Sequence, residues 1–175
     1  MELRAATYSD APAIAKLHAN SWRFAYRGVL SDDYLDSQAE RDRSELWEER
    51  LNSLAPDQNV FVLVEDGCLI GFACVYADHH PDFGSFLNNL HVAEGRLRLG
   101  CGTRLMSAVR DFCVELSPAR PVYLWVVDSN KRAQAFYSRL GATLRGTDSW
   151  EPPGGGLALL YRLAWNSPRE IQLAG

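Results

Sequence analysis

The segment from His91 to Leu116 constrains the fold more than any other, because it joins the end of a strand, a glycine turn and an amphipathic helix. Gly100 and Gly102 stand where that helix must begin. The first turn of a helix leaves backbone N–H groups without partners and carries the positive end of the helix dipole. Because glycine adds no Cβ, the turn is suited to cradle a phosphate, although a G-x-G can also serve only to cap a strand–helix turn. The residues expected on the buried helix face are Leu105, Met106, Val109, Phe112, Cys113 and Leu116.

Two common nucleotide-binding loops fit this turn poorly. A Walker loop needs Gly-Lys-Ser/Thr, which does not follow Gly102. A Rossmann fingerprint needs a third glycine where Leu105 stands. A nucleotide-binding protein of either kind is therefore disfavoured.

The rest of the chain predicts alternating strands and helices. Expected strands cover residues 3–6, 60–65, 68–76, 86–92, 122–127, 142–149 and 157–165. Besides the central helix, expected helices run from the N-cap Ser9 toward Gly28, from Ser31 over a short turn, from a capping box at 37–40 to about Leu54, and over 130–140. The order predicts a mixed α/β sheet with helices on its faces, and the length of 175 residues predicts one domain, 1–175.

Composition narrows the class of protein. A net charge of −4 gives no reason to expect nucleic-acid binding. The four cysteines lack CxxC spacing, which favours reduced thiols in a cytoplasmic protein. Met1 is followed by acidic Glu2, and no apolar run approaches the length of a membrane span, so neither a signal peptide nor a membrane partner is expected. His79 and His80 lack a third ligand nearby, so no metal is expected.

Two separated motifs resemble the acetyl-CoA motifs of the GNAT superfamily of N-acetyltransferases. The first is L-H-V at 90–92 followed by G-C-G at 100–102, and the second is N-x-x-A-x-x-F-Y-x-x-L-G-A at 130–142. S-W-x-x-x-Y at 21–26 resembles a common variant of the family's first helix. The resemblance covers nearly the whole chain. It implies a mostly antiparallel central sheet of about seven strands flanked by helices, the GNAT-like acyl-CoA N-acyltransferase fold.

The sequence also departs from the family pattern. Leu97 occupies the position of a usual Gln or Arg, and Ala142 replaces a usual Phe after Gly141. Phe86 stands where the family often has a Glu that acts as general base. The usual base is therefore absent from its usual place.

The resemblance implies acetyl-CoA as co-substrate, without a metal, and an amine acceptor. Backbone groups of 97–103 would hold the pyrophosphate, and 90–92 would offer backbone partners to the pantetheine arm. Arg98, Arg104 and Arg132 are expected to meet phosphates unless they are ordinary surface charges. The expected cofactor-binding residues are Leu90, Val92, Leu97, Arg98, Leu99, Gly100, Cys101, Gly102, Thr103, Asn130, Arg132, Ala133 and Phe136.

Catalytic and acceptor residues follow from the chemistry of acetyl transfer. Tyr137 is expected to protonate the departing thiolate, unless it is only a packed ring. His91 is the leading candidate base, with His79, His80 and Asp82 as alternatives, and a water chain or an already neutral amine would need no base. The residues expected to contact the acceptor, or otherwise to pack in the core, are Trp22, Tyr26, Tyr34 and Trp150.

The predicted function is acetyl transfer from acetyl-CoA to a primary amine of a small molecule or a protein. A different acyl donor or an O-linked acceptor on the same scaffold is one alternative. A non-catalytic acyl-CoA-binding sensor is another, because fold does not fix function. The sequence does not identify the acceptor or the oligomeric state, and a homodimer is compatible with it.

Overall fold

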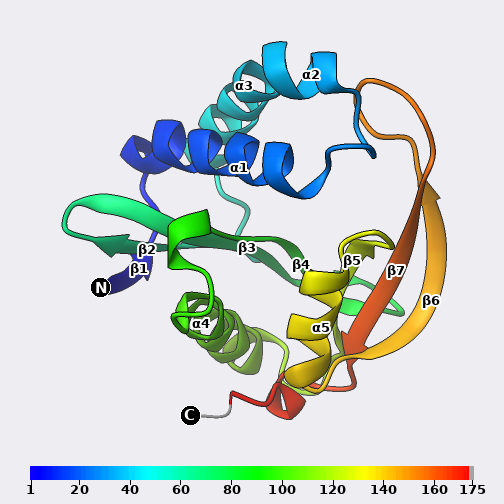
Figure 1. The fold of residues 1–175 in the computed structure, drawn as a ribbon. Helices are drawn as coiled ribbons and strands as arrows, with labels where there is room; N and C mark the ends of the chain where they lie inside the picture. Colours follow the sequence, from blue (N-terminus) through cyan, green and yellow to red (C-terminus); the bar gives the residue numbers. More distant parts are fainter. Residues whose placement is uncertain (174–175) are drawn as a thin grey trace.

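The computed structural model describes residues 1–173 and builds them around one seven-stranded sheet in the order β1-β2-β3-β4-β5-β7-β6 (Figure 1). The strands are β1 Glu2–Ala5, β2 Gln58–Glu65, β3 Cys68–His80, β4 Gly84–Val92, β5 Val122–Val127, β6 Thr143–Trp150 and β7 Ala158–Trp165. β4 and β5 run parallel, whereas the other neighbouring pairs are antiparallel. The predicted mixed, mostly antiparallel sheet is confirmed.

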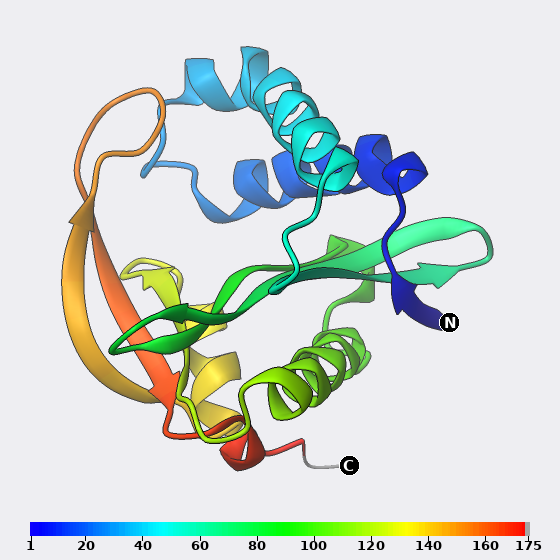
Figure 2. The ribbon, with the colours of Figure 1, turned by 180° about the vertical axis from the view of Figure 1, so that it is seen from behind.

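Helices cover both faces of the sheet (Figures 1 and 2). On one face lie α1 Ala11–Ala25, α2 Asp32–Ser37 and α3 Ala39–Asn52. On the other lie α4 Cys101–Leu116 and α5 Lys131–Arg139. Three short 3-10 turns, η1 Tyr8–Asp10, η2 Glu94–Arg96 and η3 Pro168–Glu170, complete the order of elements.

The β2–β3 hairpin follows the expected turn chemistry and is longer than expected. Asp66 and Gly67 both have positive φ, 50° and 76°, as a type I′ turn requires. β3 then continues to His80, which pairs with Gly84 of β4. The expected strand end at 76 and a loop over His79 and His80 are therefore wrong, because cross-strand pairing extends the strand to its turn.

Two expected helix caps also differ. The chain enters α1 through η1, where Thr7 N donates to Asp10 Oδ2 at 2.7 Å, so Ser9 is not the cap. The expected capping box before α3 does not form. The Ser37 hydroxyl instead donates to the Asp33 carbonyl at 2.6 Å, and Gln38 precedes α3 without a side-chain cap. In both places a local side chain–backbone bond displaced the expected pattern.

The largest buried cluster lies between α4 and the sheet. Leu105, Met106, Val109 and Cys113 are fully buried there, as the helical spacing predicts. Leu116, at the last residue of α4, is 50% exposed, so its assignment to the buried face is wrong. Across the sheet, α1 and α3 bury a second cluster against β2 and β3 that includes Trp47 and Phe72.

The sheet divides at its parallel pair. β4 and β5 are in register only at Ser85↔Val122 and Phe86↔Tyr123. A register shift against β3 leaves Asn88 between the paired Leu87 and Asn89, which is the geometry of a bulge and bends β4. Beyond Phe86 the edge of β4 that faces β5 has no strand partner, so the carboxyl ends of both strands border an opening.

Candidate active site

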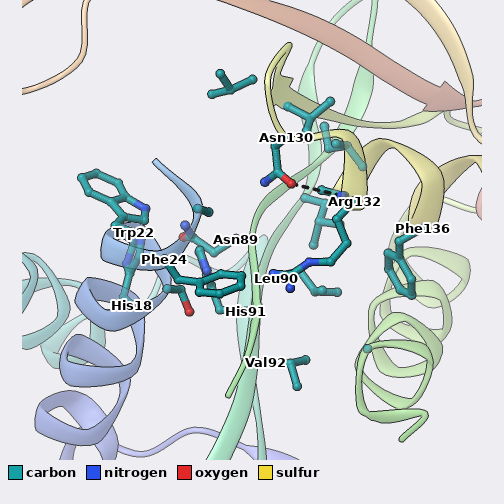
Figure 3. Close-up of a pocket in the computed structure, with 18 of the residues that line it drawn as sticks. His18, Trp22, Phe24, Asn89, Leu90, His91, Val92, Asn130, Arg132 and Phe136 are labelled. Carbon is teal, nitrogen blue, oxygen red and sulfur yellow. Dashed lines mark hydrogen bonds between the residues drawn. The ribbon is translucent and has the colours of Figure 1, made fainter. Parts of the chain in front are cut away.

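A cleft of about 1180 Å³ occupies this opening. It is bounded by α1 and α3 on one side, by α5 and the glycine turn on the other, and by β4 between them (Figure 3). Most of the residues predicted for the site line it, because the two motifs and α1 converge there. Four of the expected binding residues do not: Leu99 is largely exposed, Cys101 and Tyr34 are buried in the core, and Arg104 donates to the Met1 carbonyl at 3.4 Å.

The glycine turn presents backbone donors at the start of α4. Gly100 is the N-cap residue and has φ 78°, a conformation that L side chains rarely adopt. The first backbone bond of the helix runs from Arg104 N to Gly100 O at 3.0 Å. The N–H groups of 101–103 precede that bond and have no intrahelical acceptor. The turn therefore has the geometry of an anion site.

Gly102 has a second role that the sequence did not reveal. A Cβ at this position would lie 3.1 Å from Phe136 Cζ, closer than most such contacts. The glycine therefore lets α4 approach the aromatic side chain of α5. This packing joins the glycine turn of the first motif to the helix of the second.

The free edge of β4 runs from the bulge toward the glycine turn. Leu90 and Val92 pair with Ala73 and Gly71 of β3 on one side only. Their other side faces the gap to β5 and lines the cleft (Figure 3). An extended ligand with amide groups could add to this edge as a strand does.

α5 supplies the opposite wall. The Asn130 side chain caps it by accepting a hydrogen bond from Ala133 N at 3.1 Å. Arg132 reaches across the cleft, with Cζ 4.8 Å from the ring centroid of Phe24 on α1 (Figure 3). Phe136, also on this helix, lines the cleft (Figure 3).

Tyr137 lies deep in the same wall. It is 6% exposed and packs edge-on against Trp165, with ring centroids 6.3 Å apart. Burial raises the pKa of its hydroxyl, and the nearby Tyr26 raises it further. The hydroxyl therefore stays protonated at neutral pH and is available as a donor.

His91 lines the cleft from β4 and is a weak base in this environment. Its ring stacks on Phe72 at 5.0 Å and lies 4.6 Å from that of His18. Burial, together with the charge of Arg43, lowers the pKa of His91 to about 4. The imidazole is therefore neutral at pH 7 but holds a proton poorly.

No strong carboxylate base faces the cleft. Within residues 1–173, Glu94 of η2 is the single acidic residue that lines it. Phe86 stacks on Tyr123 at 4.9 Å, at the last paired position before β4 and β5 separate. The alternative bases His79, His80 and Asp82 lie outside the lining.

The expected acceptor aromatics lie together on the α1 side and are mostly packed. Trp22 is 9% exposed and contacts Tyr26 and Trp150 edge-on, at centroid distances of 5.9 and 6.3 Å. All three line the cleft, whereas Tyr34 is buried behind them and does not. Trp22 therefore serves the core and the cleft wall at once.

Several lining residues were missed from the sequence, namely His18, Arg43, Arg50, Asn88 and Asn89. Mixed charges along a helix such as α3 ordinarily indicate a solvated face, but Arg43 and Arg50 line the cleft because α3 lies against it. Their separation by seven residues on one helix face was the available signal. Nothing in the sequence marked His18, which is fully buried between α1 and β4.

The described part of the chain holds no group of three or more side chains suited to bind a metal ion. Within residues 1–173, no helix is long and apolar enough to cross a membrane.

A sheet that opens at its parallel pair, beside a glycine-capped helix, defines a scaffold for acyltransferases that use coenzyme A. The family model described as "Acetyltransferase (GNAT) family" matches residues 19–142, and the chain therefore belongs to the GNAT family of acetyltransferases. It is an N-acetyltransferase with acetyl-CoA as co-substrate.

Relatives and solved structures agree with this assignment. The chain is 27% identical over 155 residues to YuaI of Bacillus subtilis, named an uncharacterized N-acetyltransferase, covering 87% of this chain and 86% of the relative. It is 28% identical over 160 residues to Rv2775 of Mycobacterium tuberculosis, named a probable N-acetyltransferase, covering 89% and 87%. The PaiA N-acetyltransferase of Thermoplasma acidophilum, solved with coenzyme A, has the same fold at a TM-score of 0.71 and 18% identity, covering 92% and 96%.

Proposed function

We propose that this cleft transfers the acetyl group of acetyl-CoA to a primary amine, with the co-substrate held by the glycine turn and the free edge of β4. The observation that carries the proposal is the convergence of both features with Tyr137 on one cleft. The pyrophosphate would accept from the N–H groups of 101–103, and the pantetheine arm would extend along 90–92. The thioester would then lie near the α5 wall.

Tyr137 is the proposed acid. The amine nitrogen attacks the thioester carbonyl carbon, and the carbon–sulfur bond breaks with its electron pair left on sulfur. Tyr137 donates its proton to that sulfur and regains one from solvent. Its raised pKa keeps the hydroxyl protonated at neutral pH, so it can donate at least a hydrogen bond to the sulfur.

The amine needs no strong carboxylate to lose its own proton in this proposal. Burial is the main cause of the lowered pKa of His91, and the same burial would favour the neutral form of an amine bound beside it. Water, or His91 as a weak relay, would take the proton released after attack.

Release of free CoA thiol from acetyl-CoA over a panel of primary amines tests the proposal. An active amine must give thiol and N-acetylated product in equal amounts. Tight acetyl-CoA binding with no thiol release from any amine would instead indicate a non-catalytic sensor.

A further inference from the structure

The side of the cleft away from the glycine turn carries hydrogen-bond donors and positive charge. We call five of its polar side chains the donor cluster, namely His18, Arg43, Arg50, Asn88 and Asn89. Glu94, the acidic lining residue, lies on η2 next to Asn20 and Phe24 of α1. Within the described residues, no carboxylate forms an ion pair with a member of the donor cluster.

His18 contributes a buried N–H without an acceptor. Its Nδ1 accepts a hydrogen bond of 3.0 Å from the indole Nε1 of Trp47, and an indole can only donate. Nδ1 therefore carries no proton, and burial lowers the pKa of this histidine well below its usual value, so the ring is neutral with its proton on Nε2. His18 is 1% exposed, and Nε2 has no hydrogen-bond partner although the residue lines the cleft (Figure 3). An unsatisfied buried donor is costly, and a bound acceptor would relieve that cost.

Arg43 contributes a charge that no carboxylate pairs directly, since the neighbouring Asp42 pairs with Arg41 instead. Its Cζ lies 4.4 Å from the ring centroid of Trp22, and its Nε is buried without a partner. Across residues 1–173, no carboxylate forms an ion pair with it. Charged groups that leave solvent are ordinarily paired, so this guanidinium is prepared for an anion that the chain does not supply.

Arg50 extends the donor cluster two turns along α3. Its Nη1 donates to Asn88 Oδ1 at 3.0 Å and to Asn89 Oδ1 at 3.2 Å. Because the amide oxygens already accept these bonds, the groups that both asparagines can offer to a ligand are their NH₂ donors. Arg50 also has no ion pair in the described chain, so its charge adds to that of Arg43.

We propose that the acceptor of this enzyme is an amine that carries a carboxylate, and that His18 and Arg43 receive the carboxylate. The inference rests on the proposed function, since it names the class of acceptor for the same cleft. A carboxylate has two oxygens in one plane, so one can accept from His18 Nε2 and the other from the guanidinium. A polyamine or another polycation would meet uncompensated positive charge at the same place.

Matched acceptors test this class. Amino acids, their carboxamides and their decarboxylated amines are compared by thiol release, with spermidine and phosphoethanolamine beside them. The amine of an amino amide is less basic than that of the acid, which favours the amide and makes the comparison conservative. We expect kcat/KM to be at least about tenfold higher for acids than for their matched amides, the order of one charge-assisted hydrogen bond.

Arg43→Gln is the variant that connects the preference to the site. It should raise the acceptor KM at least about tenfold and abolish the preference for acids, whereas Arg43→Lys should restore part of both. Arg41→Gln is the matched control, because Arg41 lies on the same helix and does not line the cleft. An unchanged KM for acetyl-CoA shows that the variants are folded.

Calorimetry separates this inference from the proposed function. N-acetylalanine and N-acetylphenylalanine are titrated into the CoA-bound protein beside their amides, so binding is measured without turnover. Absence of turnover with every amine would remove the proposed function, while tighter binding of the acids, lost in Arg43→Gln, would still support a carboxylate site. Equal binding of acids and amides, a preference that survives in Arg43→Gln, or a preference for phosphoethanolamine or spermidine would overturn the inference.

Discussion

The two sides of the cleft are built differently. The side proposed for acetyl-CoA presents backbone groups, namely the N–H groups at the start of α4 and the free edge of β4. The side proposed for the acceptor presents side chains from α1, α3 and β4, and among these His18 Nε2 and Arg43 Nε lack hydrogen-bond partners. A site made of backbone groups requires a particular backbone conformation, and therefore glycines at fixed positions. A pocket made of side chains can instead acquire a different ligand when one of its residues is replaced. The predictions below test this contrast, from the largest effect to the smallest.

The largest effect is expected at the glycine turn. Gly100→Glu or Gly102→Glu should remove detectable acetyl-CoA binding, because a like charge enters the anion site at a cost of several kcal/mol. Calorimetric titration of the folded variants measures this. Gly95→Glu is the control, since its Cβ would meet open space and it does not line the cleft. Unchanged affinity in either main variant would remove the phosphate cradle.

Tyr137→Phe should lower kcat by at least roughly tenfold with little change in acetyl-CoA affinity, because general acid catalysis typically contributes about 10²–10⁴-fold. The ring and its packing remain. Single-turnover kinetics isolate the chemical step, and Tyr123→Phe, a change at a buried tyrosine outside the cleft lining, is the control. Wild-type kcat with chemistry limiting would show that the hydroxyl is not the acid.

His91, one of two histidines in the cleft wall, should make stability depend on pH. The pKa of His91 is about 4 in the folded chain, against about 6.5 in an unfolded one. Between these values the unfolded chain binds the extra proton, so the free energy of unfolding falls as the pH falls from about 6.5 to 4. His91→Gln should reduce that fall by about 1 to 3 kcal/mol. Urea denaturation at several pH values measures it, and a slope equal to that of a His79→Gln control would contradict the assignment.

The smallest effect is expected at Trp22. Trp22→Phe keeps most of the buried ring but weakens its contact with the Arg43 guanidinium, which is worth about 0.5–1 kcal/mol at exposed sites. The acceptor KM should rise about twofold to fivefold, while the KM for acetyl-CoA stays the same. Equal changes in both constants would assign Trp22 to packing alone.

The same contrast explains what the sequence could predict. The glycine turn, β5 and the motif of α5 were predicted closely, because their periodicity and conformational demands are local. The lining by Arg43 and Arg50 was not, because mixed charges on a helix look solvated until the sheet places α3 over β4. The role of His18 could not be predicted, because the hydrogen bond that leaves its proton on Nε2 comes from Trp47, 29 residues later in the chain. Gly102 was predicted only as a ligand-binding residue. Its contact with Phe136 depends on how α4 and α5 pack, which the sequence does not show.

The junction between β4 and β5, with only two paired positions, also bears on which parts of the sheet unfold as separate units. Because the ladder is nearly broken there, the β1–β4 and β5–β7 parts of the sheet are held together chiefly by the core beneath α4, which includes Leu63 from one part and Leu124 and Leu163 from the other. Such a boundary is where a sheet separates into cooperative units in hydrogen exchange. A ligand that binds along β4 and α5 contacts both units. Its binding would therefore raise the free energy needed to separate them.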